Sequence, residues 1–200
     1  MFYSKEIGLS LLICHFLASI TVGFLFRNYK KDKDKFFRTC QDIKKTKKEI
    51  TFSNLGEIFS ESIINSINLI LTIGGFIVLF SVIISILNES KIFDNIARFF
   101  SNFGIDKNIT EAILSGFLEI TNGLKIASQL KLKSLSLNII LSSFLLGFGG
   151  ISIMMQVYSI ISKQKISIKP YIYGKLLQAI FSIMYICLLL KAIPILKYSL

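Results

Sequence analysis

The sequence has little of what a metal centre or an enzyme active site needs. Its 200 residues include three cysteines, one histidine, two prolines and no tryptophan. The cysteines, Cys14, Cys40 and Cys187, are odd in number and far apart, so they predict neither a disulfide framework nor a metal site. Because no nucleophile motif, glycine-rich nucleotide motif or ligand cluster is found, we expect a protein that is not an enzyme and that needs no cofactor.

Acidic residues are also scarce. The chain carries 23 Lys or Arg against 12 Asp or Glu, and only two acids follow Asp106. Much of the excess charge lies between Arg27 and Lys48, where ten basic residues accompany three acids. Few aromatic residues interleave with these charges, as they would in a nucleic-acid groove, so we expect no nucleic-acid partner. A basic segment after an apolar one is typical of a cytoplasmic loop beside membrane lipid.

Long apolar segments dominate the rest of the chain. Hydrophobic residues make up 52% of it and the mean hydropathy is +0.64, which is too apolar for an ordinary soluble domain. The sequence therefore predicts an all-α polytopic membrane protein with about five hydrophobic segments, including broken or re-entrant helices. We expect a transmembrane helix over 1–26, a basic cytoplasmic loop over 27–53 and a larger membrane domain over 54–200.

Polar positions and turn residues divide that membrane domain into five parts. They are a helix over 54–88, an interfacial helix over 91–103, a broken or re-entrant segment over 108–130, a broken helix over 134–162 and a last helix over 171–190. The interfacial helix is predicted because its apolar and polar residues separate onto two faces. Asn108 and Glu111 have the spacing of a capping box, which would start the next segment.

A polar stripe follows the first of these helices. Its members recur at spacings of three or four and so fall on one helix face: Glu57, Glu61, Asn65, Asn68 and Thr72. Such a stripe lines a polar access path in some membrane proteins and makes interhelical hydrogen bonds in others. The sequence leaves both interpretations open.

One stretch sets a carboxylate inside an apolar segment. Glu119 follows Gly116-Phe117-Leu118 and precedes Thr121, Asn122 and Gly123. An ionisable group at this depth costs roughly 2.5–3.5 kcal/mol on insertion scales, so it persists where it faces a protein interior or a water-filled cavity. The polar triplet favours a helix break at 121–123, because Asn competes for backbone bonds and Gly accepts positive φ. A broken span and a re-entrant hairpin both fit this pattern.

A second interruption follows at 147–150. Two helices broken in succession are typical of transporters, which hold substrates and coupling ions at such breaks. Glycine for close helix packing is the competing interpretation of the second break. The predicted solute site draws on both breaks, and its members are Glu119, Thr121, Asn122, Gly123, Gly149, Gly150, Ser152 and Gln156.

Several strings agree in order and spacing with one known family. They are HFLASITVGFLFRNY at 15–29, GGFIVLFSVI at 74–83, GFLEITNG at 116–123 and FGGISIMMQVYSIISK at 148–163, with KPY at 169–171. Together they resemble the sporulation integral membrane protein family called YlbJ, of the nucleoside-transporter-like gate domain group. The resemblance covers essentially the whole chain, which looks like the C-terminal half of that family's members.

The resemblance implies one half of an inverted-repeat transporter and a role in endospore formation. The implied activity is movement of dipicolinic acid, a small organic anion, across the outer forespore membrane. The alternatives are a non-transporting sporulation scaffold and one half of a nucleoside-like solute carrier. A half-length chain would work with a second copy of itself or with a partner that supplies the N-terminal half.

An anionic solute needs a cation or hydrogen-bond donors. Lys125 and the N-terminal end of a half-helix after Gly123 are candidates, although Lys125 could instead extend its amine to the membrane interface. Glu119 would stay ionised by pairing with Lys125 or with a cation. Alternatively, it would be protonated and couple solute movement to protons, because burial disfavours the charged form.

Overall fold

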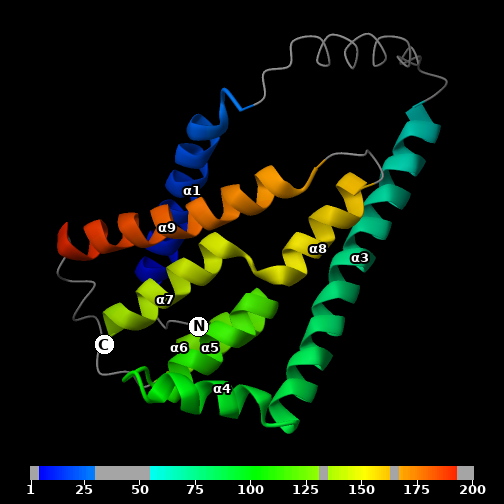
Figure 1. Ribbon diagram of the computed structural model, residues 1–200. Helices are drawn as coiled ribbons and strands as arrows, with labels where there is room; N and C mark the ends of the chain where they lie inside the picture. The colour runs from blue at the N-terminus through cyan, green and yellow to red at the C-terminus, as the bar shows by residue number, and fades with distance from the viewer. Residues whose placement is uncertain (1–4, 30–54, 131–134, 163–166, 193–200) are drawn as a thin grey trace.

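The computed structural model describes residues 5–29, 55–130, 135–162 and 167–192, and every regular element in these ranges is a helix (Figure 1). The helices are α1 (Lys5–Phe26), α3 (Leu55–Glu89), α4 (Ile92–Ser101), α5 (Lys107–Leu118), α6 (Ile120–Gln129), α7 (Leu135–Phe148), α8 (Gly150–Ile161) and α9 (Lys169–Ala192). The basic loop expected at 27–53 lies almost entirely outside the described residues. The prediction of an all-α polytopic protein is confirmed for the described ranges.

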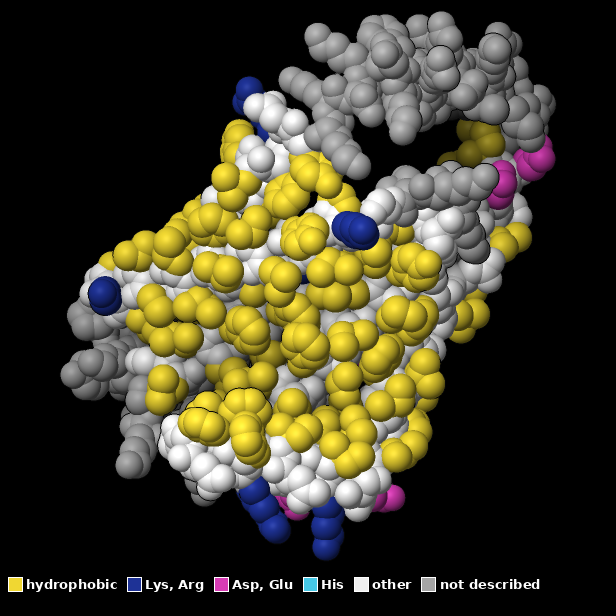
Figure 2. All heavy atoms as spheres, in the orientation of Figure 1, with side chains coloured by type: hydrophobic (Ala, Val, Ile, Leu, Met, Phe, Trp, Pro, Cys, Tyr) yellow, Lys and Arg dark blue, Asp and Glu magenta, His cyan; other side chains and the backbone are white. Residues whose placement is uncertain are grey.

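Within these ranges, four helical stretches are long and apolar enough to cross a membrane. They are α1, α3, α7 continued by α8, and α9. With 12 and 10 residues, α5 and α6 are about 18 and 15 Å long, roughly half of a hydrocarbon core of about 30 Å. Apolar side chains cover most of the middle of the face shown in Figure 2, and most of the charged side chains in view lie at its edges. These are the features of a multi-pass membrane protein.

The packed centre is formed by α1, α7 and α9. Its buried cluster consists of Ile7, Leu11, Cys14, Ile139 and Ile186. Small and hydroxyl side chains let α7 and α9 approach closely: a Cβ built on Gly147 would lie 2.6 Å from the Cα of Ala179. Nearby, the hydroxyl oxygens of Ser143 and Ser182 are 2.8 Å apart. Small residues and interhelical hydroxyl bonds are the usual means of packing helices in lipid.

The first half of α3 stands apart from the other described helices. Its buried residues, Phe80 and Ile84, both lie in its second half. Every residue from 59 to 75 is exposed. The polar stripe from Glu61 to Thr72 is therefore uncovered by the helices described here.

Across the end of α3 runs α4, which is shorter than the predicted 91–103 (Figure 1). It buries Phe93 and Ala97. On its outer side, the ring of Phe99 contacts the rings of Phe100 and Phe103, and all three side chains are exposed. An amphipathic helix with an aromatic outer face is typical of a membrane interface.

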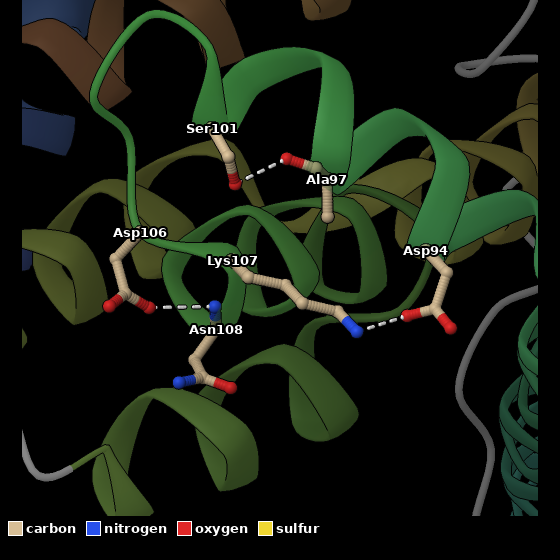
Figure 3. Close-up of polar contacts among 6 residues, drawn as sticks. All are labelled: Asp94, Ala97, Ser101, Asp106, Lys107 and Asn108. Carbon is tan, nitrogen blue, oxygen red and sulfur yellow. Dashed lines mark hydrogen bonds and ion pairs between the residues drawn. The ribbon is translucent and has the colours of Figure 1, made fainter.

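Charged and polar side chains fasten α4 to the start of α5 (Figure 3). Lys107 Nζ lies 2.6 Å from Asp94 Oδ1, and the hydrogen bond and charge of Lys107 hold the pKa of Asp94 below its ordinary value. Asp106 caps α5, because its carboxylate accepts the Asn108 N–H at 2.8 Å. The capping box predicted at Asn108 and Glu111 is therefore wrong, since the aspartate two residues earlier already satisfies the helix start.

Candidate functional site

The helices α5 and α6 form a hairpin that turns at a single residue, Glu119. Its backbone is extended, with φ −142° and ψ 119°. Gly116 and Gly123 meet across the hairpin, since a Cβ built on Gly123 would lie 2.1 Å from the Gly116 Cα. Farther from the turn, Ala112 and Ala127 belong to one buried cluster. Of the two alternatives left open by the sequence, the structure shows the re-entrant hairpin.

The Glu119 carboxyl group is buried, with 1% exposure, and caps α6. Its Oε1 accepts the Thr121 N–H at 3.1 Å. Its Oε2 accepts the Asn122 N–H at 2.9 Å and the Thr121 hydroxyl at 2.5 Å. Both oxygens are thus used to satisfy the first turn of α6, whose N–H groups have no partner within the helix.

The helix break lies at Glu119, so its predicted place at 121–123 is wrong. Thr121, Asn122 and Gly123 are all inside α6, which begins at Ile120. The reason is that the Glu119 carboxylate caps α6 before the polar triplet is reached. Gly123 serves the close contact with α5 instead of breaking the helix. The half-helix expected after Gly123 therefore starts three residues before that glycine.

The second break separates α7 from α8 and touches the first. Gly149 and Gly150 have φ values of 85° and 79°, a conformation that glycine adopts readily and other residues rarely. A Cβ built on Gly150 would lie 3.1 Å from the Gly116 carbonyl oxygen and 3.3 Å from the Ile120 nitrogen. Glycine therefore brings the two breaks into backbone contact.

Side chains of α5, α7 and α3 pack near this contact. The rings of Phe117 and Phe148, which precede the two breaks, stack with centroids 4.6 Å apart and an interplanar angle of 14°. From α3, the Ser81 hydroxyl accepts a hydrogen bond from Asn122 Nδ2 at 2.9 Å. We call residues 116–122 and 148–150, together with Ser81, the break junction.

Of the other residues predicted for the solute site, Ser152 and Gln156 lie together on α8, whereas Lys125 lies on the surface of α6. Ser152 is buried in the first turn of α8 and accepts a hydrogen bond from Gln156 Nε2 at 3.3 Å. Lys125 is exposed on α6, and the expected pairing of Glu119 with Lys125 is not seen among the described contacts. Within the same ranges, no group of three or more His, Cys, Asp or Glu side chains could hold a metal ion.

Sequence reasoning missed the cation that lies beside the second break, Lys175 of α9. A Cβ built on Gly149 would lie 3.6 Å from Lys175 Nζ, which also donates to Gln178 Oε1 at 3.2 Å. Ser81 was missed as well, because nothing in its apolar run distinguishes it from other serines. The pair Gly116 and Gly123, which flank Glu119 almost symmetrically, was a signal in the sequence for a tight hairpin.

Comparison with known proteins gives two matches. Residues 70–164, which contain both breaks, match the family model described as "Gate: Nucleoside recognition". The chain is also 30% identical over 212 residues to "Sporulation integral membrane protein YlbJ" of Bacillus subtilis (strain 168). That alignment covers 95% of this chain and 50% of the relative, so the chain spans about half the length of the relative it matches. No solved structure matches it.

Proposed function

Because this chain belongs to the YlbJ-type family of sporulation integral membrane proteins, we propose that it helps to move dipicolinic acid, a small organic anion, across the outer forespore membrane. The name of the relative supports a membrane role in sporulation, and the description of the matched domain supports recognition of a solute. What we propose beyond this support is the identity of the anion, the membrane that it crosses and its movement by this chain. The proposed function does not include an enzymatic reaction.

One observation carries the proposal: two helix breaks touch within the membrane domain. Irregular backbone at membrane depth is tolerated only where it is buried in protein or lines a cavity, and transporters hold substrates at such places. The carboxylate of Glu119 lies at one break and the ammonium group of Lys175 lies beside the other. A solute that carries carboxylates would find its counter-charge at Lys175.

The N-terminal end of α8 adds to that positive charge. No side chain caps the N-terminus of α8, so its first N–H groups remain available to an anion, whereas Glu119 occupies those of α6. The proposed division of roles gives anion binding to Lys175 and the start of α8. Glu119 lies at the other break and caps α6, and Asn122 of the same turn is hydrogen-bonded to Ser81 of α3.

Deleting the gene in its sporulating host tests this function. We expect spores with several-fold less dipicolinate and more dipicolinate left in the mother cell, because synthesis continues while transfer fails. Dipicolinate is measured in separated spore and mother-cell fractions, and a restored gene copy is the control. Normal spore dipicolinate in the deletion strain would contradict the proposal. Defective spore assembly with normal dipicolinate would favour the scaffold alternative.

The polar stripe of α3 supports a proposal about the partner. Asn65 and Asn68 are exposed and make no side-chain hydrogen bond within the described part of the chain. An unpaired amide facing hydrocarbon costs on the order of several kcal/mol. A second copy related by a two-fold axis along the membrane normal would place the two Glu61 side chains next to each other. Two like charges in contact are unfavourable, so a second copy is a poor partner for this stripe. We therefore propose that this stripe contacts helices equivalent to the half of the relative that this chain does not match.

Replacing Asn65 and Asn68 together with leucine tests that contact. If the stripe faces polar partner helices, the double variant still inserts but leaves the native complex, because its hydrogen bonds are lost. The measurement is the size of the tagged chain's complex after mild solubilisation. Exchanging the exposed pair Ile70→Leu and Leu71→Ile on the same helix is the matched control. An unchanged complex would show that the stripe faces lipid or water.

A further inference from the structure

The ammonium group of Lys175 is held by a neutral side chain. Lys175 belongs to α9, which packs against both α1 and α7 (Figure 1). Its Nζ donates to Gln178 Oε1 at 3.2 Å, and Gln178 Nε2 lies 3.4 Å from Nε2 of His15 on α1. No ion pair joins Lys175 to a carboxylate among the residues that the structure describes. A cation inside a membrane span usually pairs with a counter-charge, so this one is available to an anion from outside the described ranges.

Hydrogen bonds connect three side chains from α9 to α1. Because Lys175 Nζ can only donate, the amide of Gln178 must turn its oxygen toward the lysine. The amide nitrogen then donates to His15 Nε2, which is the accepting nitrogen of the neutral imidazole. His15 therefore favours the amide orientation that presents an acceptor to Lys175.

The backbone of Gln178 is fixed against the helix that ends at the second break. A Cβ built on Gly147 would lie 2.6 Å from the Ala179 Cα and 3.0 Å from the Gln178 carbonyl oxygen, so α7 and α9 touch here. Gln178 is buried, with 7% exposure. Lys175 Nζ reaches the same break, since a Cβ built on Gly149 would lie 3.6 Å from it. The amide thus holds the lysine beside the break from a fixed place.

We infer that Gln178 is a positioning residue, which together with His15 holds the Lys175 ammonium group at the second break for an anionic solute. A lysine side chain has many rotamers, and ordering it before the solute arrives reduces the entropy lost on binding. A neutral amide orders the lysine without cancelling its charge. A carboxylate in its place would compete with the solute, and an apolar side chain would leave the lysine free to move. The inference rests on the proposed function, in which the solute meets Lys175.

Binding of radiolabelled dipicolinate to membranes from sporulating cells tests this role. Such membranes hold the full chain in its native complex, and membranes of the deletion strain give the background. We expect Gln178→Leu to weaken the specific binding by roughly 2–10-fold, because Lys175 is no longer ordered. Gln178→Glu should weaken it by about tenfold or more, since the new carboxylate pairs with Lys175 at a high effective concentration.

The order of the two variants separates positioning from a purely structural role. Glutamate is nearly the same size as glutamine and keeps an oxygen for Lys175, so a structural role predicts that it disturbs the site less than leucine does. The positioning role predicts the reverse order. Tyr185→Phe is the matched control, because it removes the 2.7 Å hydrogen bond between the Tyr185 and Thr21 hydroxyls, which also joins α1 to α9. It should leave binding unchanged, and immunoblots establish equal amounts of each variant.

Three results would overturn the inference when membranes of the parent strain bind dipicolinate specifically. They are undiminished affinity in Gln178→Leu, tighter binding by Gln178→Glu than by Gln178→Leu, and equal losses in Gln178→Leu and Tyr185→Phe. The Gln178→Leu result remains decisive if Gln178→Glu accumulates poorly. Equal dipicolinate binding by membranes of the parent and deletion strains would instead contradict the proposed function itself, and this inference with it.

Discussion

Gly123→Ala is expected to prevent the α5–α6 hairpin from closing. The added Cβ would lie 2.1 Å from the Gly116 Cα and 2.5 Å from the Gly116 nitrogen, and backbone atoms cannot rotate away as side chains do. The helices must separate, which removes Glu119 from the break junction. Overpacking costs about 1–3 kcal/mol or more, and 1.4 kcal/mol is a factor of ten in the folding equilibrium. Because a larger unfolded fraction is degraded, we expect the amount of protein in the membrane fraction to fall several-fold.

A matched glycine provides the control for this prediction. Gly74 lies in the middle of α3, and nothing is within 4 Å of a Cβ built there. Gly74→Ala should leave accumulation unchanged or slightly higher, because alanine is the better helix former. Immunoblots of the membrane fraction compare the two variants. Equal accumulation would show that the hairpin does not pack as described.

Substitutions at Glu119 are expected to separate its capping role from its role toward the solute. Glu119→Ala leaves the Thr121 and Asn122 N–H groups without their acceptor. Loss of a cap costs about 0.5–2 kcal/mol, and more where water is absent, so this variant should accumulate several-fold less. Glu119→Gln keeps a carbonyl oxygen that can accept one of these bonds but loses the charge. It should accumulate nearly normally but fail to move the solute, because a neutral amide can neither hold a charge nor exchange a proton at the break junction.

Glu111→Gln is the control for the charge change. Glu111 lies on α5, eight residues before Glu119, and lines a pocket together with Asp94 and Lys107. It should leave both accumulation and solute movement unchanged. If Glu119→Gln behaves in the same way, the carboxylate serves only as a helix cap.

The membrane architecture could be predicted because it depends on local composition. Runs of apolar residues longer than a bilayer core predicted the spans, and the confirmed family resemblance rests on strings that are continuous in the sequence. The glycines at 149 and 150 pointed to an irregular backbone, and both adopt positive φ. In these cases the residue itself, or its immediate neighbours, determines the structure.

The first break was misplaced because a tertiary arrangement overrode local preference. Asn122 and Gly123 disfavour a helix when taken alone, yet a cap from Glu119 and the contact with Gly116 hold them in α6. Lys175 could not be predicted at the junction at all. It stands 26 residues after Gly149, and only the packing of α9 against α7 brings its amine there.

The central claim is that the break junction, with the buried carboxylate of Glu119, takes part in moving a solute. The most direct test is the dipicolinate content of spores from a strain whose own gene carries Glu119→Gln, with immunoblots to establish equal membrane abundance. Our account predicts low spore dipicolinate at normal abundance. Normal dipicolinate at normal abundance would contradict it, because the buried carboxylate would then have no part in moving the solute.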